Sequence, residues 1–269
     1  MSRWFAVVAM LVACTPAQGE GEVDVRIYGE AFIEEGIPAS VFADGWALQF
    51  DSFLISVGTV TVGQAGEAPG LAAPEFQVFD LARPSMGAGQ RVASGAVPTG
   101  RQDDVAFVVG PDGAAAATSE VSAEDLARMK AGGLALFVAG SASKAGVTKR
   151  FAWGFPTRTS YSECESVAEV AADGAAVVQL TIHGDHLFYD DLYSETPDVR
   201  FDLVAQADAD DDGEVTQAEL LAVDLRPLSN YQVGSTGIVD LWHFIAHQTG
   251  TLGHIDGEGH CNNTEEEEE

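Results

Sequence analysis

Acidic side chains alternate along a twelve-residue segment, residues 208–219, in a pattern that suits a hard cation. Asp208, Asp210 and Asp212 occupy its first, third and fifth positions, a glycine follows at the sixth, and Glu219 closes it at the twelfth. A cation with roughly six to eight oxygen ligands needs carboxylates on one side of a tight turn, and the alternation places them there. The segment therefore predicts a Ca²⁺ site.

Helical patterns on both sides of this segment complete a resemblance to the EF-hand family. Residues 196–207 carry apolar side chains at helical spacing, and residues 217–224 carry them again until a proline ends the run. The resemblance implies that the Glu214 backbone carbonyl is a ligand, that Thr216 acts directly or through water, and that Val215 anchors the loop in the core. The implied calcium ligands are Asp208, Asp210, Asp212, Glu214 and Glu219.

The sequence contains one loop of this pattern, whereas EF-hands usually occur in pairs that share a short β contact. A single loop has no paired lobe that could open a groove, so we expect a structural or weakly regulatory ion. Extracellular modules of this kind bind Ca²⁺ with a Kd on the order of 10⁻⁴–10⁻³ M. Because the loop's carboxylates repel one another without the cation, we expect the ion to order this segment.

The histidines indicate a second metal site, because all six follow residue 182. Two of them lie four residues apart on a predicted helix, residues 238–248, with Asp240 on the same stripe. Neutral imidazole is the commonest protein ligand of Zn²⁺ and Cu²⁺, and three or four of these side chains could converge. The other interpretation is that they are separate surface or core histidines. The candidate ligands are His183, His186, His243, His247, His254 and His260.

These observations leave three functional classes open. The first is a calcium-stabilised binding or structural surface protein, and the second is a copper or zinc binding protein that uses the histidines. The third is a metal-dependent hydrolase, since the stretch Thr181 to His186 partly resembles the His-x-His-x-Asp-His motif of metallo-β-lactamase-fold enzymes, with Thr181 in place of the first histidine. The sequence contains no nucleophile elbow, zinc-protease motif or phosphate-binding loop, so we expect no enzyme.

The elements that must position these residues are mostly strands. Runs rich in β-branched and aromatic residues alternate with clusters of Gly, Pro, Asn or Asp, which is typical of an antiparallel β-sandwich. The layout resembles the transthyretin-type sandwiches of secreted bacterial lipoproteins. Ser122 predicts the start of one helix, with Asp125 three residues later. The predicted strands are 23–27, 46–50, 53–62, 76–81, 104–109, 134–139, 148–153 and 176–182.

The N-terminus has the pattern of an export signal. A short basic start precedes an apolar run, residues 4–13, which is too short to span a bilayer. The run ends in Leu11-Val12-Ala13-Cys14, which resembles the lipobox of bacterial lipoproteins and implies that Cys14 carries lipid. Thr15 follows instead of aspartate, which resembles the outer-membrane default of Gram-negative bacteria.

The remaining cysteines, Cys164 and Cys261, form an even pair, so outside the cytosol we expect a disulfide between them. The predicted organisation is a signal peptide, a tether, a β-sandwich domain, a helical EF-hand subdomain and a solvated acidic tail. The boundaries are 1–13, 14–21, 22–195, 196–263 and 264–269.

The net charge limits the partners. The 269 residues include 42 acidic and 13 basic side chains, which gives a formal charge of −29. Nucleic acids and anionic lipid headgroups both require clusters of Lys and Arg, so we expect neither as a partner and expect membrane contact through the lipid anchor alone. Cations are the partners that this charge favours, and the sequence names no protein partner.

Overall fold

The computed structural model describes residues 19–265, and its architecture is mainly β, as the sequence predicts. The main strands are β1 (Glu20–Tyr28), β2 (Ala47–Gly63), β5 (Gln90–Pro98), β7 (Asp104–Val109), β9 (Leu136–Lys144), β10 (Val147–Phe155), β11 (Thr159–Cys164) and β13 (Ala175–Ile182). The short strands are β3 (Leu71–Ala73), β4 (Gln77–Asp80), β6 (Gly100–Arg101), β8 (Ala116–Ala117), β12 (Glu169–Val170), β14 (Glu214–Val215), β15 (Gly253–Ile255) and β16 (Asn262–Glu265). The helices are α1 (Glu30–Glu34), α2 (Ala123–Gly132), α3 (Asp202–Gln206), α4 (Gln217–Leu221) and α5 (Leu241–Gln248), with 3₁₀ turns η1 (Asp185–Phe188) and η2 (Thr249–Thr251).

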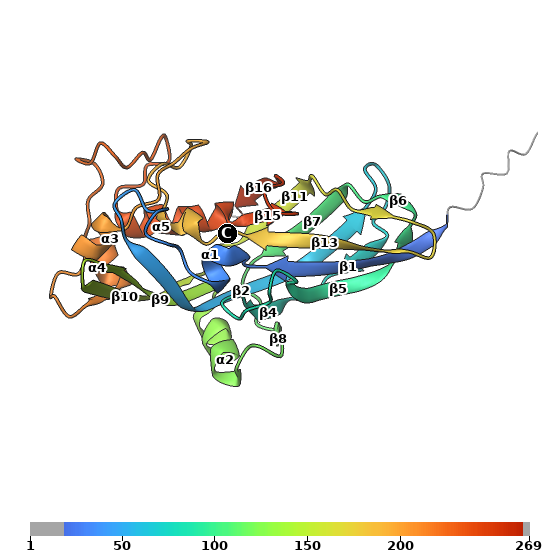
Figure 1. Ribbon diagram of the computed structural model, residues 1–269, viewed down its shortest axis with the longest axis horizontal. Coiled ribbons are helices and arrows are strands. Elements are labelled where there is room, and N and C mark those ends of the chain that lie inside the picture. Colours follow the sequence, from blue (N-terminus) through green and yellow to red (C-terminus); the bar gives the residue numbers. More distant parts are fainter. Residues whose placement is uncertain (1–18, 266–269) are drawn as a thin grey trace, which may run out of the picture.

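Two sheets enclose the main core. The larger has the order β14-β10-β9-β2-β7-β11-β16, with β3 and β4 paired to β2, and the smaller has the order β15-β13-β1-β5 (Figure 1). On β1, Val23, Val25 and Ile27 alternate with more exposed residues and are fully buried, so this strand turns one face to the core. Its pairing with β13 is parallel, which differs from the antiparallel arrangement expected throughout.

Strand β2 joins the two predicted strands 46–50 and 53–62 into one. Its register against β9 shifts between Phe50 and Ser52, so a β-bulge, and not a turn, separates the two apolar runs. A second shift, against β7, lies between Gly58 and Thr61, where Thr59 has a φ of +52°. A bulge changes which face the following residues occupy, and this explains why the strand does not alternate evenly along its length.

Helix α2 packs on the outer face of the larger sheet, away from the other helices (Figure 1). The Ser122 hydroxyl accepts a hydrogen bond from the Asp125 backbone N–H at 3.1 Å, as the sequence predicts, and Gly133 ends the helix with a φ of +57°. Met129 is buried beside Leu54 in a small second core. This core explains why the middle of β2 is buried on both faces.

The segment expected to form a separate helical subdomain contributes to both sheets. Strand β15 pairs with β13 in the smaller sheet, and β16 pairs with β11 in the larger. The expected acidic tail therefore begins inside a strand, because Thr264 pairs with Ser160. Helices α3, α4 and α5 gather at one end of the molecule, beside β9 and β10 (Figure 1).

Both helices beside the acidic loop are shorter than predicted. Before α3, Val199 forms bridges to Phe42 and Tyr189, so this stretch is extended where a helix was expected. The backbone N–H groups of Phe201 and Asp202 both donate to the Asp44 carboxylate, each at 2.7 Å. A carboxylate far away in the sequence thus caps α3.

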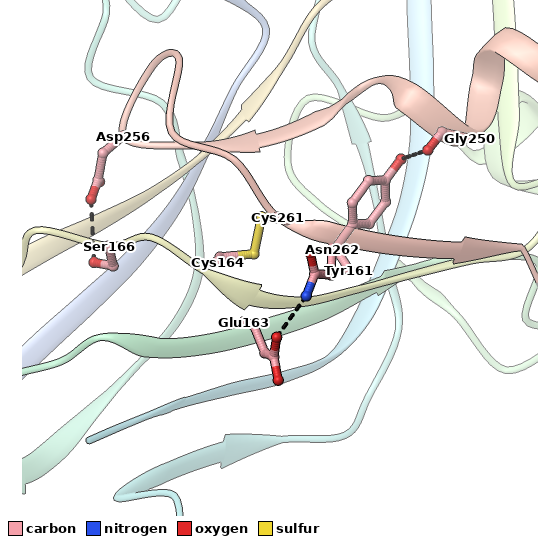
Figure 2. Close-up of a disulfide and its surroundings, with 8 residues drawn as sticks. All are labelled: Tyr161, Glu163, Cys164, Ser166, Gly250, Asp256, Cys261 and Asn262. Carbon is pink, nitrogen blue, oxygen red and sulfur yellow. Dashed lines mark hydrogen bonds between the residues drawn. A yellow bond between two sulfur atoms is a disulfide. The ribbon is translucent and has the colours of Figure 1, made fainter. Parts of the chain in front are cut away.

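The predicted disulfide between Cys164 and Cys261 is present. Around it, the Glu163 carboxylate accepts a hydrogen bond from the Asn262 side chain at 2.6 Å, and the Ser166 hydroxyl donates to Asp256 at 3.2 Å (Figure 2). The last described segment is therefore attached to the end of β11 by one covalent bond and several polar contacts.

Candidate metal centre

The structure brings the first three carboxylates of the acidic loop together. Asp208, Asp210 and Asp212 each offer one oxygen, and these oxygens lie within 4.8 Å of one another. The loop folds through its own backbone: Gly213 has a φ of +84°, and its N–H donates to Asp208 at 2.9 Å. The N–H of Glu214 donates to Asp212 at 2.7 Å. Three carboxylates held this close are suited to a hard divalent cation.

Asp208 is the buried member of this group. Its side chain is fully buried and forms an ion pair with Lys149 of β10, whose side chain is 14% exposed. The hydrogen bond from Lys149 holds the pKa of Asp208 below its usual value. The second carboxylate oxygen, Oδ1, is buried and has no hydrogen-bond partner among the described residues. The sequence does not predict Lys149 as a site residue, because nothing in the spacing of the loop indicates which strand lies beside it.

The expected closing ligand, Glu219, lies across the loop from its start. Its Oε1 accepts a hydrogen bond from the Ala209 N–H and its Oε2 from the Thr216 N–H, both at 2.8 Å. With Thr216 as the N-cap, Glu219 forms the capping box of α4, and these hydrogen bonds lower the pKa of the Glu219 carboxyl. Glu219 is thus ionised and connects the first residues of the loop to the helix that follows it.

The loop is held against the larger sheet. Strand β14, which lies inside the loop, pairs in parallel with β10, so that Glu214 lies opposite Arg150 and Val215 opposite Phe151. Val215 is buried, and its carbonyl accepts a hydrogen bond from the Trp153 indole at 2.8 Å. The loop thus makes a short β contact with a strand of the larger sheet.

Four of the six histidines form a second cluster. The ring of His183 lies 5.1 Å from that of His186 and 4.3 Å from that of His254, and His254 lies 6.0 Å from His260. His183 follows β13, His186 lies in η1, and His254 lies in β15 opposite Thr181 of β13. The pairing of β15 with β13 therefore brings the two parts of the chain together.

Burial keeps two of these imidazoles neutral. It lowers the pKa of His186 to about 3, and electrostatic repulsion from the neighbouring His183 contributes to this shift. It likewise lowers the pKa of His254 to about 3, with further contributions from the neighbouring histidines. Since only neutral imidazole coordinates a metal, His186 and His254 are in the required form at neutral pH.

Carboxylates surround this cluster, and none of them is among the ligands predicted from the sequence. Ligand atoms of His183, Asp185 and His186 lie within 4.8 Å of one another, and so do those of Glu30, His183 and Glu258. Burial raises the pKa of both Asp185 and Glu30. The stretch His183 to His186 gives a local signal for Asp185, but Glu30 comes from α1 and has none.

The other two histidines, His243 and His247, are on α5. His243 is exposed, and its Nδ1 hydrogen bonds to the carboxylate of Asp240. Asp240 is the N-cap of the helix. His247 is on the same helix and belongs to none of the groups of close metal-ligating atoms found in residues 19–265. Neither member of the predicted pair on this helix is therefore in one of those groups.

Cys14 and the signal sequence lie outside the described residues. Within residues 19–265, no helix is long and apolar enough to cross a membrane. Comparisons with protein-family models, with curated proteins and with solved structures find no match to this chain.

Proposed function

We propose that this protein binds one Ca²⁺ ion through the loop of residues 208–219 and that the ion stabilises a binding or structural protein. The observation that carries the proposal is the buried Oδ1 of Asp208, which has no hydrogen-bond partner among the described residues. An unsatisfied buried carboxylate oxygen is costly, and a cation shared with Asp210 and Asp212 would satisfy it. The other ligands in this proposal are the Glu214 carbonyl and Glu219.

The attachment of the loop favours a structural ion over a sensor. Val215 is buried and β14 is paired with β10, so the loop is fixed to the sandwich on one side. Helices α3 and α4 are five residues each, too short to expose a groove by swinging apart. Calcium would connect the end of α3 to the start of α4.

We further propose that the protein is exported and attached to the cell envelope by lipid on Cys14, in the outer membrane of a Gram-negative bacterium. The sequence Leu11 to Cys14 supports this proposal, and an extracytoplasmic location agrees with the disulfide between Cys164 and Cys261. Extracellular calcium modules work with a Kd on the order of 10⁻⁴–10⁻³ M, so a weak site suits such a compartment.

Two neighbouring aspartates provide the matched test. Asp210 and Asp211 are both exposed, but only Asp210 belongs to the carboxylate group. Asp211 has a φ of +59°, which asparagine also tolerates, so Asp211→Asn removes the same charge without straining the loop. The chelator-treated protein is titrated with CaCl₂ by calorimetry and melted with and without the ion.

The wild type and Asp211→Asn should bind one equivalent and melt at a higher temperature with calcium. At a concentration 100-fold above Kd, the ion should add about 2.7 kcal/mol of stability. Asp210→Asn should lose most of this gain. Absence of both binding heat and a melting shift in the wild type at several millimolar calcium would refute the proposal, and so would an equal loss in the two variants.

A further inference from the structure

The histidine cluster contains two buried polar atoms that lack partners. Asp185 Oδ1 and His254 Nδ1 are both inaccessible to solvent and have no hydrogen-bond partner among residues 19–265. The remaining contacts fix the side chains: the Tyr189 hydroxyl donates to Asp185 Oδ2 at 3.2 Å, and His186 Nδ1 lies 2.9 Å from the Thr251 carbonyl. Since His186 Nδ1 meets a carbonyl, it carries the proton, and Nε2 keeps its lone pair.

This arrangement has the features of a prepared metal-binding shell. The imidazole that holds a metal through one nitrogen usually donates its other N–H to a carbonyl or carboxylate, as His186 does to Thr251. His183 and Asp185 complete a group in which the ligand atoms lie within 4.8 Å of one another. His254, 4.3 Å from His183 between ring centres, brings a third imidazole from a different strand.

We propose that His183, Asp185, His186 and His254 bind one divalent transition-metal ion of the class that prefers imidazole, Cu²⁺ or Zn²⁺. Three nitrogen donors and one carboxylate match the ligand preference of these ions, whereas Ca²⁺ prefers oxygen alone. Thiolate ligands are not available from Cys164 and Cys261, which form the disulfide. The site is distinct from the calcium loop in residues and in chemistry.

The ion has a route to this site. A cavity of about 260 Å³ is lined by His186, His254, His260 and Tyr189, and His260 is exposed. Glu30 and Glu258 lie beside His183 and add negative charge around the cluster. Since the whole chain carries a charge of −29, cations are concentrated near this surface. An ion held here would keep one side toward the cavity, where a small ligand could reach it.

The test uses the folded, metal-free protein with its disulfide intact, titrated separately with ZnCl₂ and CuCl₂ by calorimetry. His186→Ala and His254→Ala remove proposed ligands, and His243→Ala removes an exposed histidine on α5 as the matched control. The wild type and His243→Ala should bind one equivalent with equal affinity. Each ligand variant should bind at least about tenfold more weakly. Electron paramagnetic resonance of the Cu²⁺ form should show coupling to several nitrogens.

A second variant separates a lost ligand from a lost fold. His186→Gln can still donate to the Thr251 carbonyl, and circular dichroism and melting of the metal-free forms report whether each variant folds. Asp210→Asn should keep the transition-metal site while losing calcium, so failure of one proposal leaves the other standing. The inference would be overturned if neither ion binds at about 100 μM, if His243→Ala loses as much affinity as His186→Ala, or if the Cu²⁺ spectrum shows oxygen ligands alone.

Discussion

Replacing Lys149 with methionine removes one positive charge from beside the first carboxylate of the proposed calcium loop. The ammonium group of Lys149 pairs with the carboxylate of Asp208. Methionine keeps a side chain of similar length and preserves much of the apolar packing of the lysine stem. The variant therefore tests one interaction: the competition between this ammonium group and the calcium ion for the same carboxylate.

The geometry sets the size of the effect. A calcium ion lies roughly 2.3–2.6 Å from its ligand oxygens, so the ammonium in its present place would be about 4–5 Å from the ion. A single and a double positive charge at that separation repel by about 2 kcal/mol even at the dielectric constant of water. Because Lys149 is 14% exposed, the ammonium can move partly into solvent, which leaves about 1–2 kcal/mol. Calcium should therefore bind Lys149→Met about 5- to 30-fold more tightly.

Calorimetric titration of the chelator-treated variants measures this difference directly. Lys144→Met is the matched control, because Lys144 pairs with Asp202 at 2.7 Å, outside the loop, and should leave the calcium affinity nearly unchanged. Without calcium, Lys149→Met should melt below the wild type, since the buried Asp208 charge loses its partner, and calcium should restore most of that loss. Equal or weaker calcium binding by Lys149→Met would show that the ion does not bind at Asp208 and would refute this reasoning.

Three further predictions follow from other parts of the chain. The double variant Cys164→Ser, Cys261→Ser should lose up to about 4–5 kcal/mol of stability in urea denaturation, because a loop of roughly 100 residues is released, and an unchanged midpoint would contradict it. Cys14→Ser should move the protein from the membrane fraction to the soluble fraction. Retention of this variant in the membrane fraction would refute the lipid anchor. Arg91 holds the pKa of Asp24 below its usual value, so Arg91→Gln should raise that pKa. The ionised Asp24 carboxyl stabilises the fold above its pKa, and this stabilisation is lost as the pH falls through the pKa. The variant should therefore gain less stability from this carboxyl than the wild type does. Carboxyl NMR titration measures this pKa, which should stay unchanged if the ion pair is not formed in solution.

Much of the secondary structure follows from local sequence. The alternation along β1 has its physical cause in the period of a strand, and the cap of α2 requires only Ser122 and a backbone N–H three residues later. The pairing of Cys164 with Cys261 follows from their number once export is assumed. The close approach of Asp208, Asp210 and Asp212 is also local, because neighbouring residues in one turn cannot lie far apart.

Other features depend on which segments pair in space. The sequence alone shows two apolar runs where β2 is one bulged strand, since the bulge forms only against β9 and β7. The sequence predicts helices on both sides of the acidic loop that are longer than α3 and α4. Before α3, bridges formed by Val199 keep the chain extended where a helix is predicted. Long-range pairing overrides helix propensity here, since propensity contributes only tenths of a kcal/mol per residue.

The two candidate centres illustrate the same division. The ligands of the calcium loop are adjacent in the chain, so their spacing alone determines that they can meet, although only the fold places Lys149 beside them. The histidine cluster joins His183 and His186 to His254 through the pairing of β13 with β15. His243 is not part of the histidine cluster, although His243 and His247 have regular helical spacing in the sequence. Residues distant in sequence converge only where the backbone hydrogen bonds of the sheets bring their strands together, and this information is spread over the whole chain.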